Sequence, residues 1–272
     1  MQNFSISPVH MIGSVWKHKH LINELVKRDV LGRYRGSVIG LLWSFLTPVF
    51  LLGVYTFVFS VVFNARWNTG SDSRIEFALV LFAGLLVFNL FSECVNRAPS
   101  LILSNVNYVK KVVFPLEILP LVALGSALFH MLASLCVWLL FYCIFFGLPN
   151  VSALLLPLIL LPLILLIVGT SLLLASLGVY LRDVAQLIGT LTTALMFLSP
   201  IFYPASALPV EYQKILMLNP LFPVIEQVRG VLMWGQVPDW YFLGAYTIFS
   251  AVVAWAGFAW FQKTRKGFAD VL

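Results

Sequence analysis

Long stretches without a charged residue constrain this chain more than any other feature. The longest covers 64 residues from Ile118 to Leu181, and thirty residues separate Arg35 from Arg66. A helix rises about 1.5 Å per residue, so about 20 apolar residues cross the roughly 30 Å hydrocarbon core of a bilayer. Charged residues make up 10% of the chain, against about 25% in soluble domains. The chain is therefore predicted to be an all-α integral membrane protein.

The uncharged runs divide into six predicted transmembrane helices. The 64-residue run is too long for one crossing, and the turn sequence Gly-Leu-Pro-Asn at 147–150 splits it into a hairpin. We therefore expect one transmembrane domain over residues 37–272, with spans at about 37–63, 77–92, 118–146, 152–180, 184–202 and 241–261. An even number of crossings returns the C-terminus to the side on which the chain starts.

The distribution of Lys and Arg predicts the orientation. The expected cytoplasmic segments carry thirteen of these residues and the expected outer segments carry four. Cytoplasmic loops of membrane proteins are enriched in positive charge, so both termini are predicted to be cytoplasmic. The net charge of +6 is explained by contact with anionic membrane lipids and needs no nucleic-acid partner.

The cytoplasmic N-terminal segment, residues 1–36, is predicted to form an amphipathic helix on the membrane surface. Its apolar residues fall at spacings compatible with one helical stripe: Ile12, Trp16, Ile22, Val26 and Val30. Gly32, Gly36 and Gly40 follow at intervals of four residues. On a helix this spacing predicts a smooth face that a neighbouring backbone can approach closely.

Prolines divide residues 202–240 into apolar pieces that are too short to cross a membrane. We expect two short re-entrant helices here, at Val210–Leu218 and Val224–Trp234, which dip into the outer leaflet. Glu226 and Arg229 are three residues apart and are predicted to pair. A simple interfacial hairpin that shields the bundle explains the same pattern, and both interpretations stay open at this point.

Five short motifs resemble one family of proteins in their order along the chain. They are RYRGSVIGLLWSFLTP at 33–48, NVNYVKKVVFPLEILP at 105–120, YLRDV at 180–184, SPIFYP at 199–204 and the C-terminal RKGFADVL. Together they resemble the permeases of ABC transporters that export lipid-linked polysaccharides such as O antigen, which are related to capsule and teichoic acid exporters. The resemblance implies a multi-pass transporter subunit of the bacterial inner membrane rather than an enzyme.

The resemblance also implies partners. A second copy of the chain and two ATP-binding cassette subunits would complete the transporter, with lipid-linked polysaccharide as substrate. The chain lacks the phosphate-binding sequence G-x-x-x-x-G-K-[ST], so ATP and Mg²⁺ are expected on the partner subunit and no cofactor is expected on this chain.

Three groups of polar residues take roles from the same resemblance. The cytoplasmic entrance would contain Arg33, Tyr34 and Arg35; the loop that couples to the ATPase would contain Ser104, Asn105, Lys110 and Lys111; and the periplasmic gate would contain Glu226 and Arg229. Without the resemblance, the second of these groups reads equally as a plain positively charged cytoplasmic loop.

Aromatic residues are the candidates for contact with the sugar chain, because the C–H faces of sugars lie against aromatic rings without an ionic contact. The candidates are Trp43, Phe50, Tyr55, Phe57, Phe59, Phe63, Phe197, Phe202 and Tyr203. In the first predicted span they form stripes at intervals of four and seven residues. Packing against lipid or neighbouring helices is the alternative role of each ring.

We expect neither a catalytic nor a metal site in this chain. His130 is the only histidine inside a predicted span and no carboxylate shares that span, so it is expected to be a hydrogen-bonded packing residue. A membrane enzyme acting on lipid-linked glycans would need a convergent set of His, Asp or Glu, which the spans are not expected to supply. An ATP-independent channel or carrier would need ionisable residues at the membrane midplane.

Overall fold

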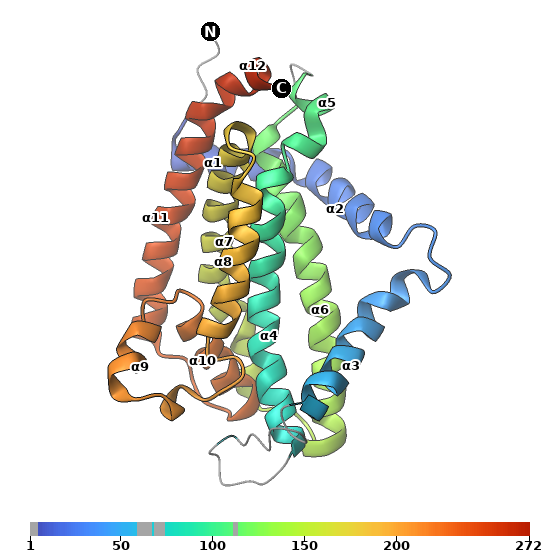
Figure 1. Ribbon diagram of the computed structural model, residues 1–272, viewed down its shortest axis with the longest axis vertical. Coiled ribbons are helices and arrows are strands. Elements are labelled where there is room, and N and C mark those ends of the chain that lie inside the picture. The colour runs from blue at the N-terminus through green and yellow to red at the C-terminus, as the bar shows by residue number, and fades with distance from the viewer. Residues whose placement is uncertain (1–4, 59–66, 68–73, 111–113) are drawn as a thin grey trace.

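The computed structural model describes residues 5–58, 67, 74–110 and 114–272. In these ranges the chain forms a helical bundle (Figure 1). Its long helices are α4 (Arg74–Arg97), α6 (Leu119–Phe146), α7 (Leu156–Tyr180) and α11 (Trp240–Thr264). The shorter α3 (Trp43–Tyr55) leans away from the bundle at one end, and α8 (Val184–Leu198) packs beside α4 and α7.

Short helices complete the fold. The α-helices are α1 (Pro8–Lys17), α2 (Lys19–Arg33), α5 (Val106–Val109), α9 (Val210–Leu216), α10 (Phe222–Met233) and α12 (Phe268–Val271). The 3₁₀ turns are η1 (Gly40–Leu42), η3 (Ala98–Ser100), η4 (Leu103–Asn105), η5 (Leu116–Ile118), η6 (Val151–Leu155), η7 (Ala205–Ala207) and η8 (Arg265–Gly267). Helices α1, α5 and α12 lie at the same end of the bundle (Figure 1).

Within the described residues, five helical segments are long and apolar enough to cross a membrane, against the six that hydropathy predicts. They are Gly40–Val58, Arg74–Ser100, Leu116–Phe146, Val151–Tyr180 and Trp240–Val271. The predicted fifth span, 184–202, is represented by α8, which has 15 residues and ends at Leu198. Ser199 is extended because the following Pro200 disfavours a helical conformation at the residue before it.

Two other boundaries differ from the sequence prediction. The predicted second span ended at Ser92, but α4 continues through Glu93 to Arg97. The predicted first span began at residue 37, but its α-helix begins at Trp43. The predicted glycine stripe is wrong, because Gly36 and Gly40 have positive φ angles of 85° and 57° and form the corner between α2 and α3.

The N-terminal apolar stripe is divided between two helices, which meet at His18. Ile12 and Trp16 of α1 are exposed, whereas α2 buries Leu25 against Ile118 and Val122. The predicted single amphipathic helix is therefore wrong, because α1 and α2 pack against different parts of the bundle: α1 contacts α11 and α2 contacts α6.

Helix α4 lies at the centre of the bundle, in contact with α6, α7, α8 and α10. Every residue from Phe77 to Phe88 is buried. A helix that is apolar on all sides needs neighbours on all sides to exclude it from water. This requirement places α4 in the core and the more exposed spans around it.

A very close helix contact joins α7 and α11 through two glycines. A Cβ atom on Gly257 would lie 2.1 Å from the carbonyl oxygen of Gly169, and a Cβ on Gly169 would lie 2.4 Å from that of Val253. Small residues allow backbones to approach this closely, which increases van der Waals contact in lipid.

Replacing Gly257 with Ala should therefore separate α7 from α11. Overpacking of this kind costs about 1–3 kcal/mol, so we expect a lower midpoint of thermal unfolding in detergent. The matched control is Gly244→Ala on the same helix, where a Cβ would meet no atom within 4 Å. Equal unfolding midpoints for the two variants would contradict the tight crossing.

Candidate functional site

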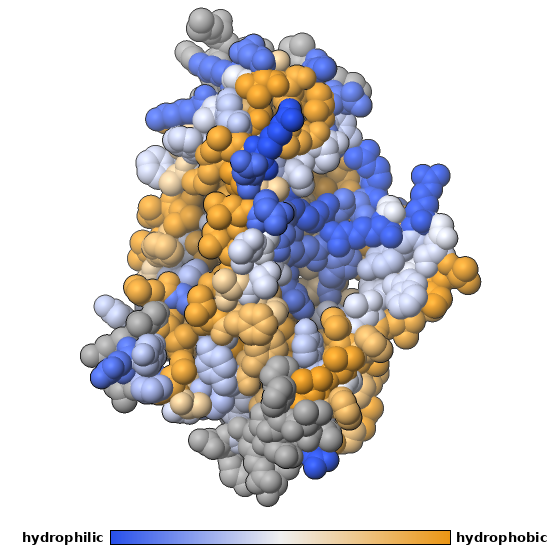
Figure 2. Space-filling model, viewed as in Figure 1, coloured by the Kyte–Doolittle hydropathy of each residue, from blue (hydrophilic) through white to orange (hydrophobic). Residues whose placement is uncertain are grey.

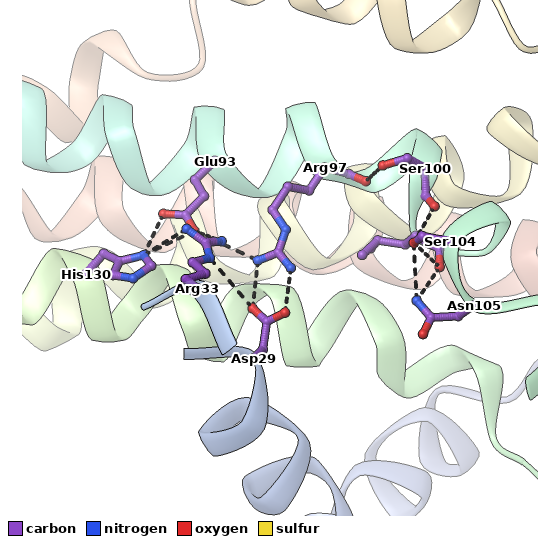
Figure 3. Close-up of polar contacts among 9 residues, drawn as sticks. Asp29, Arg33, Glu93, Arg97, Ser100, Ser104, Asn105 and His130 are labelled. Atoms are coloured by element: carbon purple, nitrogen blue, oxygen red, sulfur yellow. Dashed lines mark hydrogen bonds and ion pairs between the residues drawn. The ribbon is translucent and has the colours of Figure 1, made fainter. Parts of the chain in front are cut away.

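Five charged or titratable side chains from three helices meet beside α4 (Figure 3). Arg97 donates two hydrogen bonds to Asp29, at 3.0 and 2.9 Å. Arg33 pairs with Glu93, and His130 Nδ1 lies 3.1 Å from Glu93 Oε2. We call Asp29, Arg33, Glu93, Arg97 and His130 the charge cluster. It joins the end of α2 to α4 and α6.

The charge cluster is partly buried, and its groups neutralise one another. Burial raises the pKa of the Asp29 carboxyl, but hydrogen bonding and attraction from Arg97, together with attraction from Arg33, outweigh it, so the net pKa lies below the usual range. Asp29 is thus ionised at neutral pH. The two carboxylates and two guanidinium groups of the cluster balance one another in charge.

The charge cluster adds a contact that the sequence did not indicate. No carboxylate shares the helix of His130, as expected, but Glu93 of the neighbouring helix α4 contacts it. The predicted second span ends at Ser92 and leaves Glu93 outside it. The i, i+4 spacing of Glu93 and Arg97 was the signal that α4 continues, since both then face the same side of one helix.

The predicted cytoplasmic entrance lies partly at a cavity of about 370 Å³ between α2, α3, α4 and α6. Arg33, Tyr34 and the candidate path residue Trp43 line it, together with Asn89 and Ser134. Arg35 is not among the lining residues. The Tyr34 ring meets His130 edge-on at 6.2 Å. The cavity therefore combines aromatic rings with amide, hydroxyl and charged groups.

The other aromatic candidates fall into separate places. Phe202 lies 6.2 Å from Tyr55 of α3 and 5.9 Å from Phe197 of α8, measured between ring centroids, so these rings connect the two helices. Tyr203 donates a hydrogen bond to the Phe197 carbonyl at 3.2 Å.

Two candidates of the first span lie outside this aromatic contact. Phe57 lines a second, apolar cavity of about 470 Å³, and Phe50 is 71% exposed. Phe59 and Phe63 lie outside the described residues.

The predicted coupling loop is held by α2 and by the C-terminal end of the chain. Arg28 donates to the Tyr108 hydroxyl at 2.9 Å, and Arg265 pairs with Glu117 at 2.7 Å. Ser14 of α1 also donates to Glu117, at 3.0 Å. These contacts join Tyr108 and Glu117 of the loop to the terminal segments, so that the loop and the two terminal segments form one connected layer.

The coupling candidates lie within this layer. The Ser104 hydroxyl and the Asn105 amide bond to backbone carbonyls of the preceding turn, at 2.8 and 2.9 Å. Lys110 is exposed at the end of α5. Lys111 lies outside the described residues.

The predicted pairing of Glu226 and Arg229 is confirmed, at 2.9 Å. Arg229 is fully buried and also donates to the carbonyls of Val80, Pro200 and Ile201, at 3.1, 2.6 and 2.9 Å. The sequence did not indicate this burial. A relevant signal is Gly84, since a Cβ there would lie 2.8 Å from the Arg229 guanidinium.

Arg229 is thus the polar centre of the opposite end of α4. It connects α10 to the carbonyls that follow α8 and to α4 itself. A buried guanidinium is stable only when carbonyls and carboxylates satisfy its donors. Among the described residues, no group of three or more His, Cys, Asp or Glu side chains is arranged to hold a metal ion.

Substituting Arg97→Leu should destabilise the fold, because the Asp29 carboxylate loses both hydrogen bonds. Charge-assisted hydrogen bonds contribute about 1.5–3 kcal/mol, and partial exposure places the expected loss near the lower figure. Unfolding midpoints of Arg97→Leu, Asp29→Leu and the double variant give the coupling energy. Lys27→Leu, at an exposed position of α2, serves as control; strict additivity of the two substitutions would contradict the pair.

Arg229→Lys should destabilise more strongly, since an ammonium group cannot reach three carbonyls and Glu226 together. Breaking a buried ion pair costs roughly 3–5 kcal/mol. Glu226→Gln keeps an acceptor oxygen and should cost less. The measurement is the yield and unfolding midpoint of each variant in detergent. A midpoint for Arg229→Lys equal to that of the unmodified protein would refute the role given to the guanidinium.

Comparison with known proteins identifies the family of this chain. The chain is 29% identical over 264 residues to the O-antigen export system permease protein RfbA of Myxococcus xanthus, covering 96% of this chain and 99% of the relative. It is 25% identical to RfbA of Klebsiella pneumoniae over 253 residues, covering 93% and 95%. It is 26% identical to the polysialic acid transport protein KpsM of Escherichia coli over 259 residues, covering 91% and 94%. The model of the ABC-2 type transporter family matches residues 20–233, and the chain therefore belongs to this family of multi-pass membrane proteins.

Proposed function

We propose that this chain is the permease subunit of an ATP-driven exporter that moves lipid-linked polysaccharide, most specifically O antigen, across the bacterial inner membrane. The observation that carries the proposal is the nearly full-length match to O-antigen export permeases. The described helices form membrane spans, line a polar cavity and carry a charge cluster whose groups pair with one another. This arrangement suits passage of a ligand better than chemistry on it.

ATP hydrolysis is assigned to a separate subunit. The sequence contains no G-x-x-x-x-G-K-[ST] motif. The layer formed by α1, α5 and α12 is the proposed docking surface. Two contacts join this layer to the bundle: the hydrogen bond from Arg28 to Tyr108 and the ion pair between Arg265 and Glu117. Through them, a movement of the docked ATPase would reach α2 and α11 as rigid-body motion.

Two copies of the chain, each with one ATP-binding cassette subunit, would enclose the path. The contact between Tyr55, Phe197 and Phe202 connects α3 with the end of α8, which makes this pair of helices the proposed moving wall. Arg229 would hold the gate formed by α9 and α10, which we place at the outer leaflet as re-entrant helices. Transport of a long polymer needs many weak contacts of this kind.

Capsular polysaccharide is the second candidate substrate. The match to the polysialic acid transport protein supports it, although at lower coverage than the match to the Myxococcus permease. The two candidates differ in the polymer and share the mechanism.

Loss of this chain should cause undecorated polysaccharide to accumulate inside the cell, because synthesis would continue without export. The purified chain should hydrolyse no ATP, and the ATPase encoded with it should co-purify and supply that activity. Normal surface polysaccharide in the deletion strain, or ATP hydrolysis by the chain alone, would overturn the proposal.

Trp43→Ala should slow export roughly two- to tenfold, since an aromatic contact contributes about 0.5–1.5 kcal/mol. Trp43→Phe should retain most of the activity. The control is Trp260→Ala on α11, because Trp260 and Trp43 are similarly exposed, at 46% and 44%. Export is measured as surface polysaccharide per unit time after induction. The same loss in both alanine variants would argue against a specific sugar contact at Trp43.

A further inference from the structure

From Phe77 onwards, the residues of α4 and of its η3 extension that are not buried are all polar. Between Phe77 and Ser100, every apolar residue is buried. The six residues that are not buried all have polar or charged side chains. We call these six the polar stripe: Asn89, Ser92, Glu93, Asn96, Arg97 and Ser100. Their spacing of three and four residues places them on one side of the helix.

A polar stripe on a transmembrane helix does not suit contact with lipid. An amide or hydroxyl group in hydrocarbon without a hydrogen-bond partner costs several kcal/mol. The surrounding spans behave differently: their exposed residues include Leu132, Leu140 and Ile144 on α6, and Ile248 and Val252 on α11. Figure 2 shows the contrast, with a hydrophilic patch between α4 and the α2–α3 corner beside hydrophobic surfaces of the bundle.

Other helices flank the polar stripe on both sides. Towards α3, Asn89, Ser92 and Glu93 line the cavity of about 370 Å³ whose other walls include Trp43 and Tyr34. Towards α8, the Thr192 hydroxyl donates to Asn96 Oδ1 at 2.9 Å. Residues of the stripe thus line the cavity that they share with α3 and contact α8, and both of these helices carry aromatic candidates.

We propose that the polar stripe is the surface along which the carbohydrate part of the substrate passes, with Asn89 and Asn96 as its main hydrogen-bonding contacts. The proposal rests on the proposed function and deepens it. Glu93 and Arg97 already pair with Arg33 and Asp29, so the stripe offers amides and hydroxyls without excess charge. Such groups both donate and accept hydrogen bonds, as sugar hydroxyls do.

The first test is whether the stripe meets water. In a chain with Cys94, Cys136 and Cys143 replaced by Ser, single cysteines are introduced as Asn89→Cys and Asn96→Cys. Their reaction with a charged, membrane-impermeant methanethiosulfonate is timed in inverted membrane vesicles. A thiol must ionise in water to react. We expect rates at least tenfold higher than for Leu140→Cys, at an exposed position of α6; rates as low as the control would overturn the proposal.

The second test identifies the occupant. Labelling of Asn89→Cys is compared in cells that make the polysaccharide and in cells in which its synthesis is blocked, with a hydrolysis-deficient ATPase partner to stall export. We expect the polymer to slow labelling at least threefold, and to leave the rate at Lys110→Cys, on the exposed loop, unchanged. A hydrated stripe without protection by polymer would reject the carbohydrate contact.

Failure of the proposed function would look different. If the unmodified chain with its ATPase partner exports no polysaccharide in the complemented deletion strain, the proposed function fails whatever the thiol rates are. If export is normal but neither cysteine is accessible or protected, only the inference about the polar stripe fails.

Discussion

The structure depends on one constraint, the burial of α4 among apolar neighbours while one of its faces stays polar. Of the most apolar part of its span, 78% is buried, against 17–39% in the other four. The residues from Phe77 to Phe88 pack on every side, so α6, α7, α8 and α10 take their places around this helix. From Asn89 to Ser100, the residues that are not buried are all polar or charged. Protein neighbours thus surround the first half of α4, whereas its second half keeps a polar face.

Both ends of α4 are fixed by guanidinium groups. At one end, Arg97 and Glu93 bind α2 and contact α6; at the other, Arg229 binds the Val80 carbonyl together with the carbonyls that follow α8. In a low-dielectric environment such contacts have few intermediate arrangements, since a partly broken one leaves a buried charge without a partner. Helix α4 is therefore the rigid connection between the N-terminal helices and the proposed gate.

Hydropathy and charge predicted the helical class, the positions of most spans and the two short helices near the gate, because these depend on local composition. The features that the sequence did not predict depend on tertiary contacts and on backbone conformation. Glu93 seemed to end a span, but partners on α2 and α6 stabilise it within one. The corner at Gly36 and Gly40 depends on backbone angles that spacing alone does not reveal. The sequence did not reveal the polar stripe, because buried apolar residues separate its members. The predicted substrate contacts were instead aromatic residues, several of them on α3.

The most direct test of the central claim is photocrosslinking of the polymer during export. A photoreactive p-benzoylphenylalanine is placed at position 89 or at position 140, and the complex is stalled with a hydrolysis-deficient ATPase partner while polysaccharide is being made. Polysaccharide should crosslink to position 89. It should not crosslink to the control position, the exposed Leu140 of α6. Crosslinks to lipid alone at position 89, with no attached glycan while export is active in the unstalled control, would contradict a carbohydrate path along α4.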